Sequence, residues 1–250
     1  MRHMNSLPGE TRELLQQLVR LDELEGFTLI GGTALALRNG HRTSEDIDLA
    51  WDGDKLPTAR IHRLLHQLSP HETPTDIMDP FQKDLAVNDG LSLDDYHQDW
   101  LVKSVKLTFF APDEDERKLS TQDDTEKLGK LAIASEHAIF RMKSRVILRR
   151  QVSRDYFDLW YFLEHKGRKV GEVIAEMRGA DPRQTVDAHL MRLGSPRLGL
   201  DDPLWHTSLA GAPRNPQELV ESLRDIVDGH RREMARDAAL KAQQGRDHGR

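Results

Sequence analysis

A glycine pair followed by two carboxylates one residue apart is the part of this chain best suited to chemistry. Residues 27–50 read FTLIGGTALALRNGHRTSEDIDLA, with Gly31 and Gly32 ending a short apolar run and Asp46 and Asp48 following. Side chains alternate sides along a strand, so the two aspartates project to one side if this segment is a strand. Two such carboxylates repel unless a cation joins them. Mg²⁺ is the natural cation, because it binds one or two carboxylates together with substrate phosphates.

The glycine pair fits the phosphates of the same substrate. Glycine allows the backbone to turn sharply and to approach a ligand closely. A helix that starts here presents its first amides to a phosphate, with the Thr33 hydroxyl beside them. A phosphate cradle so near a metal site indicates chemistry on a nucleoside triphosphate (NTP).

This arrangement resembles the nucleotidyltransferase superfamily with a DNA polymerase β-like core, in which a Gly-Gly or Gly-Ser turn precedes Asp-x-Asp. The wording GHRTSEDIDL at 40–49 is most similar to the AbiEii/AbiGii toxin branch. The resemblance implies an α/β (α+β) fold, an NTP substrate and Mg²⁺ bound by Asp46 and Asp48. It also implies a toxin that acts with a cognate antitoxin, with RNA, tRNA in some relatives, as a plausible acceptor.

The latter half of the chain carries a second group of charged residues that could take part in catalysis. A helix predicted over 135–149 puts Lys143 within or beside the apolar stripe, where its ammonium must snorkel out or face a buried anion. The next helix, predicted over 153–167, carries Asp155 in its first turn and Asp158 three residues later. This pattern resembles the downstream motifs of AbiEii-type toxins. The resemblance implies that Lys143 and Asp155 belong to the active site, Lys143 also at the NTP, with Asp158 supporting them.

A third carboxylate of the superfamily is missing. It often projects from a strand such as the one predicted over 101–110, yet the matching face here carries Lys106 and Thr108. We therefore expect a two-carboxylate metal site, and the general base and the choice between one and two metals stay open.

Charge is distributed unevenly along the chain. The net charge is −6, but residues 1–140 hold 15 Lys+Arg against 26 Asp+Glu, whereas residues 141–250 hold 21 against 16. Arg145, Arg149 and Arg150 belong to this basic half. They form either a contact for RNA or an ordinary solvated helix face.

Length and composition limit the remaining possibilities. The 250 residues suffice for one large or two small domains, and 31% are charged. We predict a nucleotidyltransferase domain over 1–120 and a helical C-terminal domain over 121–250 that ends in a polar tail. The chain has no cysteine, which excludes disulfides and thiolate chemistry. It shows neither an apolar signal segment nor a run of the ~20 residues that a membrane span needs, so we expect a cytoplasmic protein.

These features together predict transfer of a nucleoside monophosphate from an NTP to an acceptor. Gly31, Gly32 and Thr33 would hold the phosphates. Two alternatives stay open. A small-molecule nucleotidyltransferase of the antibiotic-modifying kind would use the same parts, and a non-catalytic nucleotide-binding module could have kept the fold without the third acid.

Overall fold

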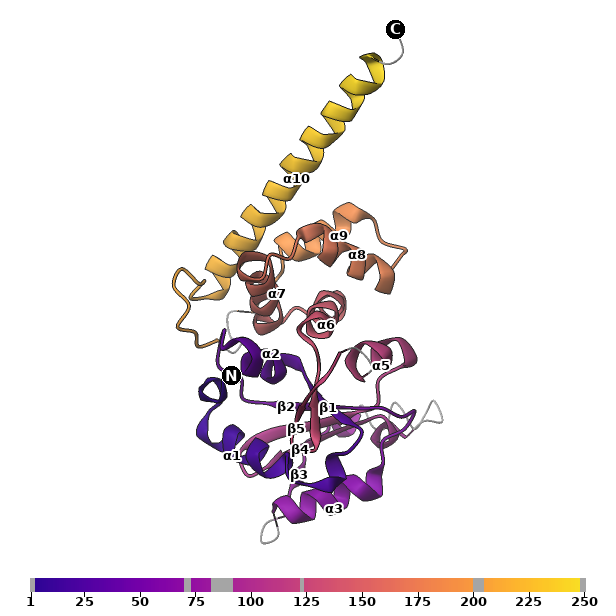
Figure 1. The fold of residues 1–250 in the computed structure, drawn as a ribbon, viewed down its shortest axis with the longest axis vertical. Coiled ribbons are helices and arrows are strands. Elements are labelled where there is room, and N and C mark those ends of the chain that lie inside the picture. Colours follow the sequence, from indigo (N-terminus) through magenta and orange to yellow (C-terminus); the bar gives the residue numbers. More distant parts are fainter. Residues whose placement is uncertain (1–2, 70–72, 82–91, 122–123, 200–204, 248–250) are drawn as a thin grey trace. The chain divides into compact units, whose positions relative to one another are not determined.

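The chain forms two compact units in the computed structural model, which describes residues 3–69, 73–81, 92–121, 124–199 and 205–247. The first unit contains Met1–Met142 and Trp205–Leu209, and the second contains Lys143–Leu204 and Ala210–Arg250. Figure 1 shows the helices and strands of both units.

A seven-stranded mixed sheet in the order β3-β4-β5-β2-β1-β7-β6 organises the first unit. Its central strands pair β2 with β5 and β1 with β7 in parallel, while the other neighbours are antiparallel. The sheet confirms the predicted mixed α and β fold class. The strands are β1 (Phe27–Ile30), β2 (Ile47–Trp51), β3 (Thr75–Asp76), β4 (His97–Val102), β5 (Val105–Phe110), β6 (Glu126–Leu128) and β7 (Leu131–Ile133).

Alternate residues of the strands are apolar, and together they form one apolar face of the sheet. The register puts Leu29, Leu49 and Phe109 in one row across three strands, and all three are buried. Helices α1 (Gly9–Leu18) and α3 (Thr58–Leu68) lie on one side of the sheet, and α2 (Gly31–Asn39) and α5 (Glu114–Thr121) on the other (Figure 1). The short 3₁₀ turns are Met4–Ser6, Asp22–Leu24 and Leu93–Asp95.

The structure corrects two sequence-based expectations in this unit. The single strand predicted over 101–110 is a hairpin, because Lys103 takes a left-handed conformation with φ 58° between β4 and β5. The stretch 111–128, interpreted as an exposed connector, holds α5 and β6. Since β6 pairs with β7 at the sheet edge, the first unit runs to Met142, whereas the predicted domain boundary lay at residue 120.

Helices build the second unit. They are the C-terminal part of α6 (Glu136–Arg149), then α7 (Ser153–His165), α8 (Val170–Ala180), α9 (Val186–Gly194) and α10 (Pro216–Asp247). Trp160 Nε1 on α7 donates to Ser222 Oγ on α10 at 2.9 Å, and Gly194 on α9 lies against Val227 on α10.

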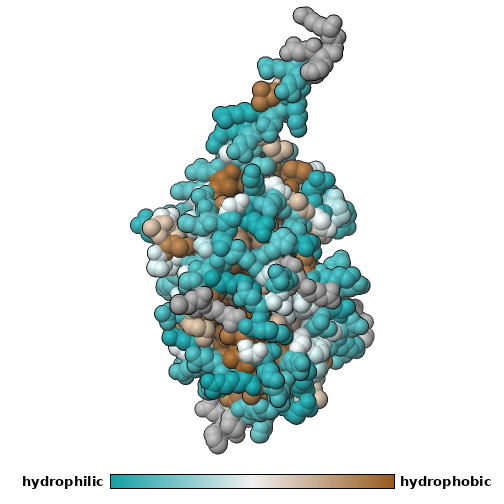
Figure 2. All heavy atoms as spheres, viewed as in Figure 1, coloured by the Kyte–Doolittle hydropathy of each residue, from teal (hydrophilic) through white to brown (hydrophobic). Residues whose placement is uncertain are grey.

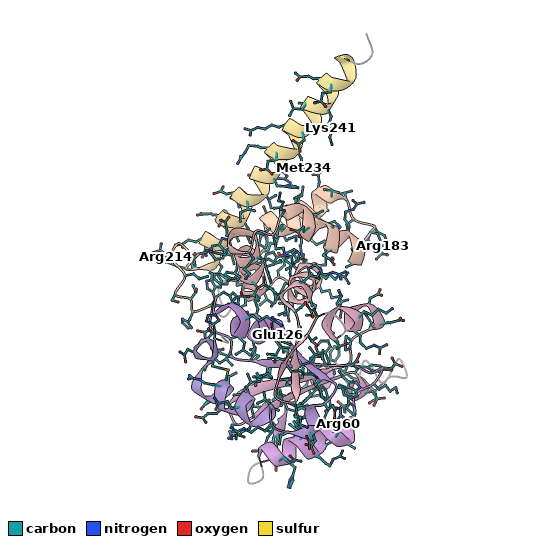
Figure 3. The ribbon with its side chains drawn as sticks, in the orientation of Figure 1. Arg60, Glu126, Arg183, Arg214, Met234 and Lys241 are labelled. Carbon is teal, nitrogen blue, oxygen red and sulfur yellow. The ribbon has the colours of Figure 1, made fainter. Side chains whose placement is uncertain are left out.

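The polar tail predicted after residue 228 continues α10. Every residue from Arg231 to Lys241 is exposed, and Met234 and Lys241 mark this stretch in Figure 3. Its surface is almost entirely hydrophilic (Figure 2). No helix in the described part of the chain combines the length and apolar character of a membrane span.

Candidate active site

The glycine pair forms the start of α2 directly after β1. Gly31 has a φ of 71°, which is left-handed and favours glycine. Asp48 Oδ2 lies 2.5 Å from the position that a Cβ on Gly31 would occupy. The register explains this contact, because Asp48 on β2 pairs with Ile30, the residue before the turn. A carboxylate is thus placed directly against the turn, with room only for a glycine beneath it.

The loop that leads into β2 is tied to the same helix. Thr33 is fully buried, and its hydroxyl donates to the carbonyl of Asp46 and lies 3.0 Å from Ser44 Oγ. Asp46 is the residue immediately before β2, and both Asp46 and Asp48 are partly exposed. Thr33 therefore fixes the loop that carries Asp46, and its predicted phosphate contact stays a prediction.

An unexpected acid lies in the same row of the sheet. Asp48 pairs with Thr108, and Thr108 pairs with Asp99 on β4, so the three residues share one face. Thr108 Oγ1 donates to Asp99 Oδ1 at 2.7 Å, while Lys106 Nζ lies 2.8 Å from Asp99 Oδ2. Partial burial favours the neutral acid, but hydrogen bonds from His97, Lys106 and Thr108 hold the pKa of Asp99 far below its ordinary value. Asp99 is therefore ionised and holds the Thr108 hydroxyl in place through its hydrogen bond.

The carboxylates of Asp46 and Asp48 fit a divalent cation whose other ligands come from the substrate and water. Within the described residues, no three His, Cys, Asp or Glu side chains are placed to hold a metal ion together. Asp46 and Asp48 provide two carboxylates, which is what Mg²⁺ takes when phosphates and water complete its octahedron.

The second predicted group comes together in the second unit. Lys143 Nζ lies 2.6 Å from Asp155 Oδ1 and 2.8 Å from Asp158 Oδ2, and all three residues are buried. The i, i+3 spacing of the two aspartates on α7 brings both carboxylates to one ammonium. Asp158 is thus a direct partner of Lys143.

Arg150 completes this cluster. Its Nε donates to Asp155 Oδ2 at 2.8 Å and its Nη2 to Asp155 Oδ1 at 3.3 Å. Burial of Asp155 favours its neutral form, but the charges of Lys143 and Arg150 outweigh burial and hold its pKa below the ordinary value. Of the other two predicted RNA contacts, Arg145 pairs with Glu176 at 2.9 Å and Arg149 is exposed.

Sequence reasoning did not predict the contact of Asp99 with Thr108, the contact of Arg150 with Asp155 or the burial of Arg42. Asp99 and Thr108 are nine residues apart and meet only through hairpin register. Arg150 follows the end of α6, in the short loop that leads into α7, and its contact with Asp155 spans five residues. Arg42 stands in the quoted motif GHRTSEDIDL, but nothing in the sequence indicates that its side chain is buried.

The model of the family described as nucleotidyl transferase AbiEii toxin, type IV TA system, matches residues 13–242. The chain belongs to this family. As an AbiEii member the protein is a nucleotidyltransferase toxin, and a type IV toxin–antitoxin system implies an antitoxin as its partner.

Other similarities are more distant than this family match. The AbiEii chain is 29% identical over 173 residues to an uncharacterised protein of Aquifex aeolicus, covering 68% of this chain and 73% of that protein. A crystal structure of a proposed nucleotidyltransferase from H. pylori superposes with a TM-score of 0.46 at 17% identity, covering 92% of this chain and 98% of that chain. The nucleotidyltransferase toxin MenT4 from Mycobacterium tuberculosis superposes with a TM-score of 0.45 at 15% identity, covering 90% and 86% respectively.

Proposed function

We propose that this toxin transfers a nucleoside monophosphate from an NTP to RNA, with tRNA the first acceptor to test, in a Mg²⁺-dependent reaction. The observation that carries the proposal is the Asp48 carboxylate held against Gly31 at the start of α2. A metal-binding carboxylate and the amides of a helix N-terminus then meet at one point, as a triphosphate requires. Family membership supplies the class of reaction.

In this reaction the oxygen of the acceptor hydroxyl bonds to the α-phosphorus. The bond from that phosphorus to the oxygen bridging to the β-phosphate breaks, pyrophosphate leaves, and the hydroxyl proton passes to water. Asp46 and Asp48 would hold Mg²⁺, which would neutralise charge on the triphosphate. The amides of Gly31 and Gly32 orient the phosphates.

Lys143 stays a predicted active-site cation, and within the second unit Asp155 and Asp158 hold its ammonium. Asp155 positions this ammonium and does not accept the acceptor's proton. Both of its oxygens already accept hydrogen bonds, and a carboxyl with a lowered pKa is a weak base. Asp158 holds the same ammonium from three residues further along α7.

RNA is the preferred acceptor because exposed basic side chains gather in the second unit. Arg149 ends α6 and Arg150 follows it, and both are exposed. The exposed end of α10 carries Arg231, Arg232, Arg236 and Lys241 against two acids, Glu233 and Asp237. Cationic side chains of this kind bind a phosphate backbone without reading its sequence.

The decisive experiment incubates the protein with each α-labelled NTP, Mg²⁺ and total cellular RNA. We expect label in a tRNA band with the wild type, none with Asp48→Asn, and wild-type labelling with Asp52→Asn, which removes an exposed acid just beyond the same strand. Label in a small molecule instead of RNA would favour the antibiotic-type alternative. No labelled product with any NTP would contradict nucleotide transfer.

A salt series tests the RNA surface separately. Arg149→Ser should weaken tRNA binding and lower the slope of log K against log[salt] by about 0.7–0.9 for one lost phosphate contact. Arg183→Ser is the matched control, since Arg183 is 93% exposed in the loop between α8 and α9 (Figure 3). Equal slopes for the two variants would make Arg149 an ordinary surface residue.

A further inference from the structure

We propose that Thr108, held by Asp99, binds and orients the acceptor hydroxyl, an inference that rests on the proposed function. Thr108 is buried on β5. It pairs with Asp48 on β2 to one side and with Asp99 on β4 to the other. Because paired residues share a face of the sheet, the Thr108 hydroxyl lies in the same row as the predicted metal ligand.

The order of the strands places Thr108 on the side of Asp48 away from the glycine turn. The two neighbours of β2 in the sheet are β1, which ends at the turn, and β5, which carries Thr108. Asp48 lies against Gly31 at the turn. The turn, the predicted metal ligand and Thr108 therefore follow one another across three adjacent strands, which are about 5 Å apart.

Displacement at phosphorus gives each of these positions a role. The attacking and leaving oxygens lie roughly in line, on opposite sides of the phosphorus. With the leaving phosphates at the turn and Mg²⁺ bound by Asp48, the acceptor approaches from the strand on the other side, which is β5. Thr108 is the residue of β5 that shares a row with Asp48.

Hydrogen bonding fixes what the Thr108 hydroxyl can do. Thr108 Oγ1 donates to Asp99 Oδ1 at 2.7 Å. An ionised carboxylate has no proton to donate, so the threonine gives its single proton to Asp99 and keeps its lone pairs. These lone pairs can accept a further hydrogen bond, and the acceptor hydroxyl has a proton to donate. Asp99 acts through Thr108 and is a positioning residue.

Asp99 stays ionised at this place because three side chains donate to it. Lys106 Nζ lies 2.8 Å from Asp99 Oδ2, and His97 Nε2 lies 3.1 Å from Asp99 Oδ1. Together with Thr108 they lower the pKa of the Asp99 carboxyl despite its partial burial. A carboxylate with a lowered pKa is a weak base. Asp99 therefore does not take the acceptor's proton, which passes to water as in the proposed reaction.

A purely structural role is the competing explanation, because a hydrogen bond between paired strands also stabilises a sheet. The two roles differ in their effect on the substrates. A contact with the acceptor affects the reaction of the acceptor and not the binding of the NTP. Thr28→Val is the matched control, since Thr28 is a buried threonine on β1 of the same sheet and pairs with Ala50, outside the row of Asp48.

The test measures label transfer to total cellular RNA, and calorimetry measures the affinity for a non-hydrolysable NTP with Mg²⁺. We expect Thr108→Val to lower kcat/KM for RNA about tenfold, the effect of one lost hydrogen bond, at unchanged NTP affinity. Thr108→Ser keeps the hydroxyl and should lose much less. Thr28→Val should match the wild type in both measurements. Equal kcat/KM in Thr108→Val and Thr28→Val, or weaker NTP binding by Thr108→Val, would overturn the proposal.

A crystal structure of the wild type with a non-hydrolysable NTP and Mg²⁺ tests the geometry without turnover and without a variant. The α-phosphorus should lie about 5–6 Å from Thr108 Oγ1, because the acceptor oxygen must fit between them at about 3 Å from each. The terminal phosphates should lie at the glycine turn. Terminal phosphates directed at β5 would overturn this inference alone and leave nucleotide transfer in place. An NTP that does not bind at the turn would count against the proposed function and, with it, against this inference.

Discussion

At the scale of single residues, Gly31 and Asp48 depend on each other. The left-handed backbone at Gly31 and the carboxylate against its α-carbon leave no room for a methyl group. We expect Gly31→Ala to cost about 1–3 kcal/mol of unfolding free energy through backbone strain and to abolish nucleotide transfer by displacing Asp48. Gly179→Ala, a change into open space on α8, should leave both unchanged or raise stability slightly. Urea unfolding and label transfer measure the two effects, and an active Gly31→Ala variant would contradict the assignment.

Asp155→Asn tests how much the buried ion pairs around Lys143 contribute to the unfolding free energy. Removing one member of a buried ion-pair network leaves uncompensated charge, so we expect a loss of about 3–5 kcal/mol. Because the pKa of Asp155 is lowered in the folded state, its stabilisation is present above about pH 4, the ordinary value for Asp, and is lost as pH falls through the folded pKa. The stability gap between wild type and variant should therefore narrow on acidification.

The control for this prediction is Asp187→Asn. Asp187 also lies in the first turn of a helix, α9, but is exposed. It tests the effect of a helix dipole alone, which amounts to about 0.3–1 kcal/mol. Equal losses in Asp155→Asn and Asp187→Asn would mean that Asp155 serves only the dipole of α7.

At the scale of elements, the β4–β5 hairpin sets the position of Asp99 opposite Thr108. Its turn contains Lys103, a non-glycine residue in the left-handed region. Lys103→Gly should raise stability by about 1 kcal/mol because glycine adopts this conformation without strain. Lys103→Ala removes the same side chain and keeps the strain, so it should not stabilise. Thermal melts of both variants decide the question, and equal melting temperatures would contradict the argument.

The second unit buries a polar side chain that lacks hydrogen bonds to the described residues. His189 on α9 is fully buried, and neither ring nitrogen has a hydrogen-bond partner within the described part of the chain. We expect His189→Leu to raise the unfolding free energy by about 1–3 kcal/mol by removing an unsatisfied polar group. His66→Leu, at an exposed position of α3, is the control and should change little. A destabilised His189→Leu variant would show that the imidazole has a role that apolar packing cannot replace.

At the scale of the whole molecule, the first unit needs residues from late in the sequence, while the end of α10 contributes to neither core. Trp205–Leu209 belong to the first unit, where the buried Trp205 precedes two residues that bond to the loop between α2 and β2. No residue from Arg231 to Lys241 is buried. A chain ended after His230 should therefore melt within about 2 °C of the full chain, less than a loss of 1 kcal/mol causes.

A chain ended after residue 199 should melt far lower, because it lacks Trp205–Leu209 and all of α10. Differential scanning fluorimetry of the two truncations provides the comparison. A large decrease after removal of residues 231–250 alone would show that the end of α10 packs against the rest of the protein.

The local chemistry of this protein could be predicted from its amino-acid sequence. Glycine at a left-handed turn and carboxylates at alternate positions are local requirements, so their spacing is visible along the chain. Helical periodicity likewise predicted α6 and α7, and the hydroxyl of Ser135, the residue before α6, accepts from Ala138 N. The motif around Lys143 and Asp155 lies on these two helices, and the resemblance built on it led to the family that the chain belongs to.

Contacts between side chains of different elements depend on the three-dimensional fold and could not be predicted. Asp99 faces Thr108 through hairpin register, and Arg150, in the loop between α6 and α7, bonds to Asp155. The first unit extends beyond the predicted boundary at residue 120, because β6 and β7 complete a sheet whose other strands lie earlier in the sequence. Arg42 reads as one more surface arginine in the sequence. Its burial depends on the loop contacts from Ser6, His206 and Thr207, which are too far apart in the sequence for any periodicity to reveal.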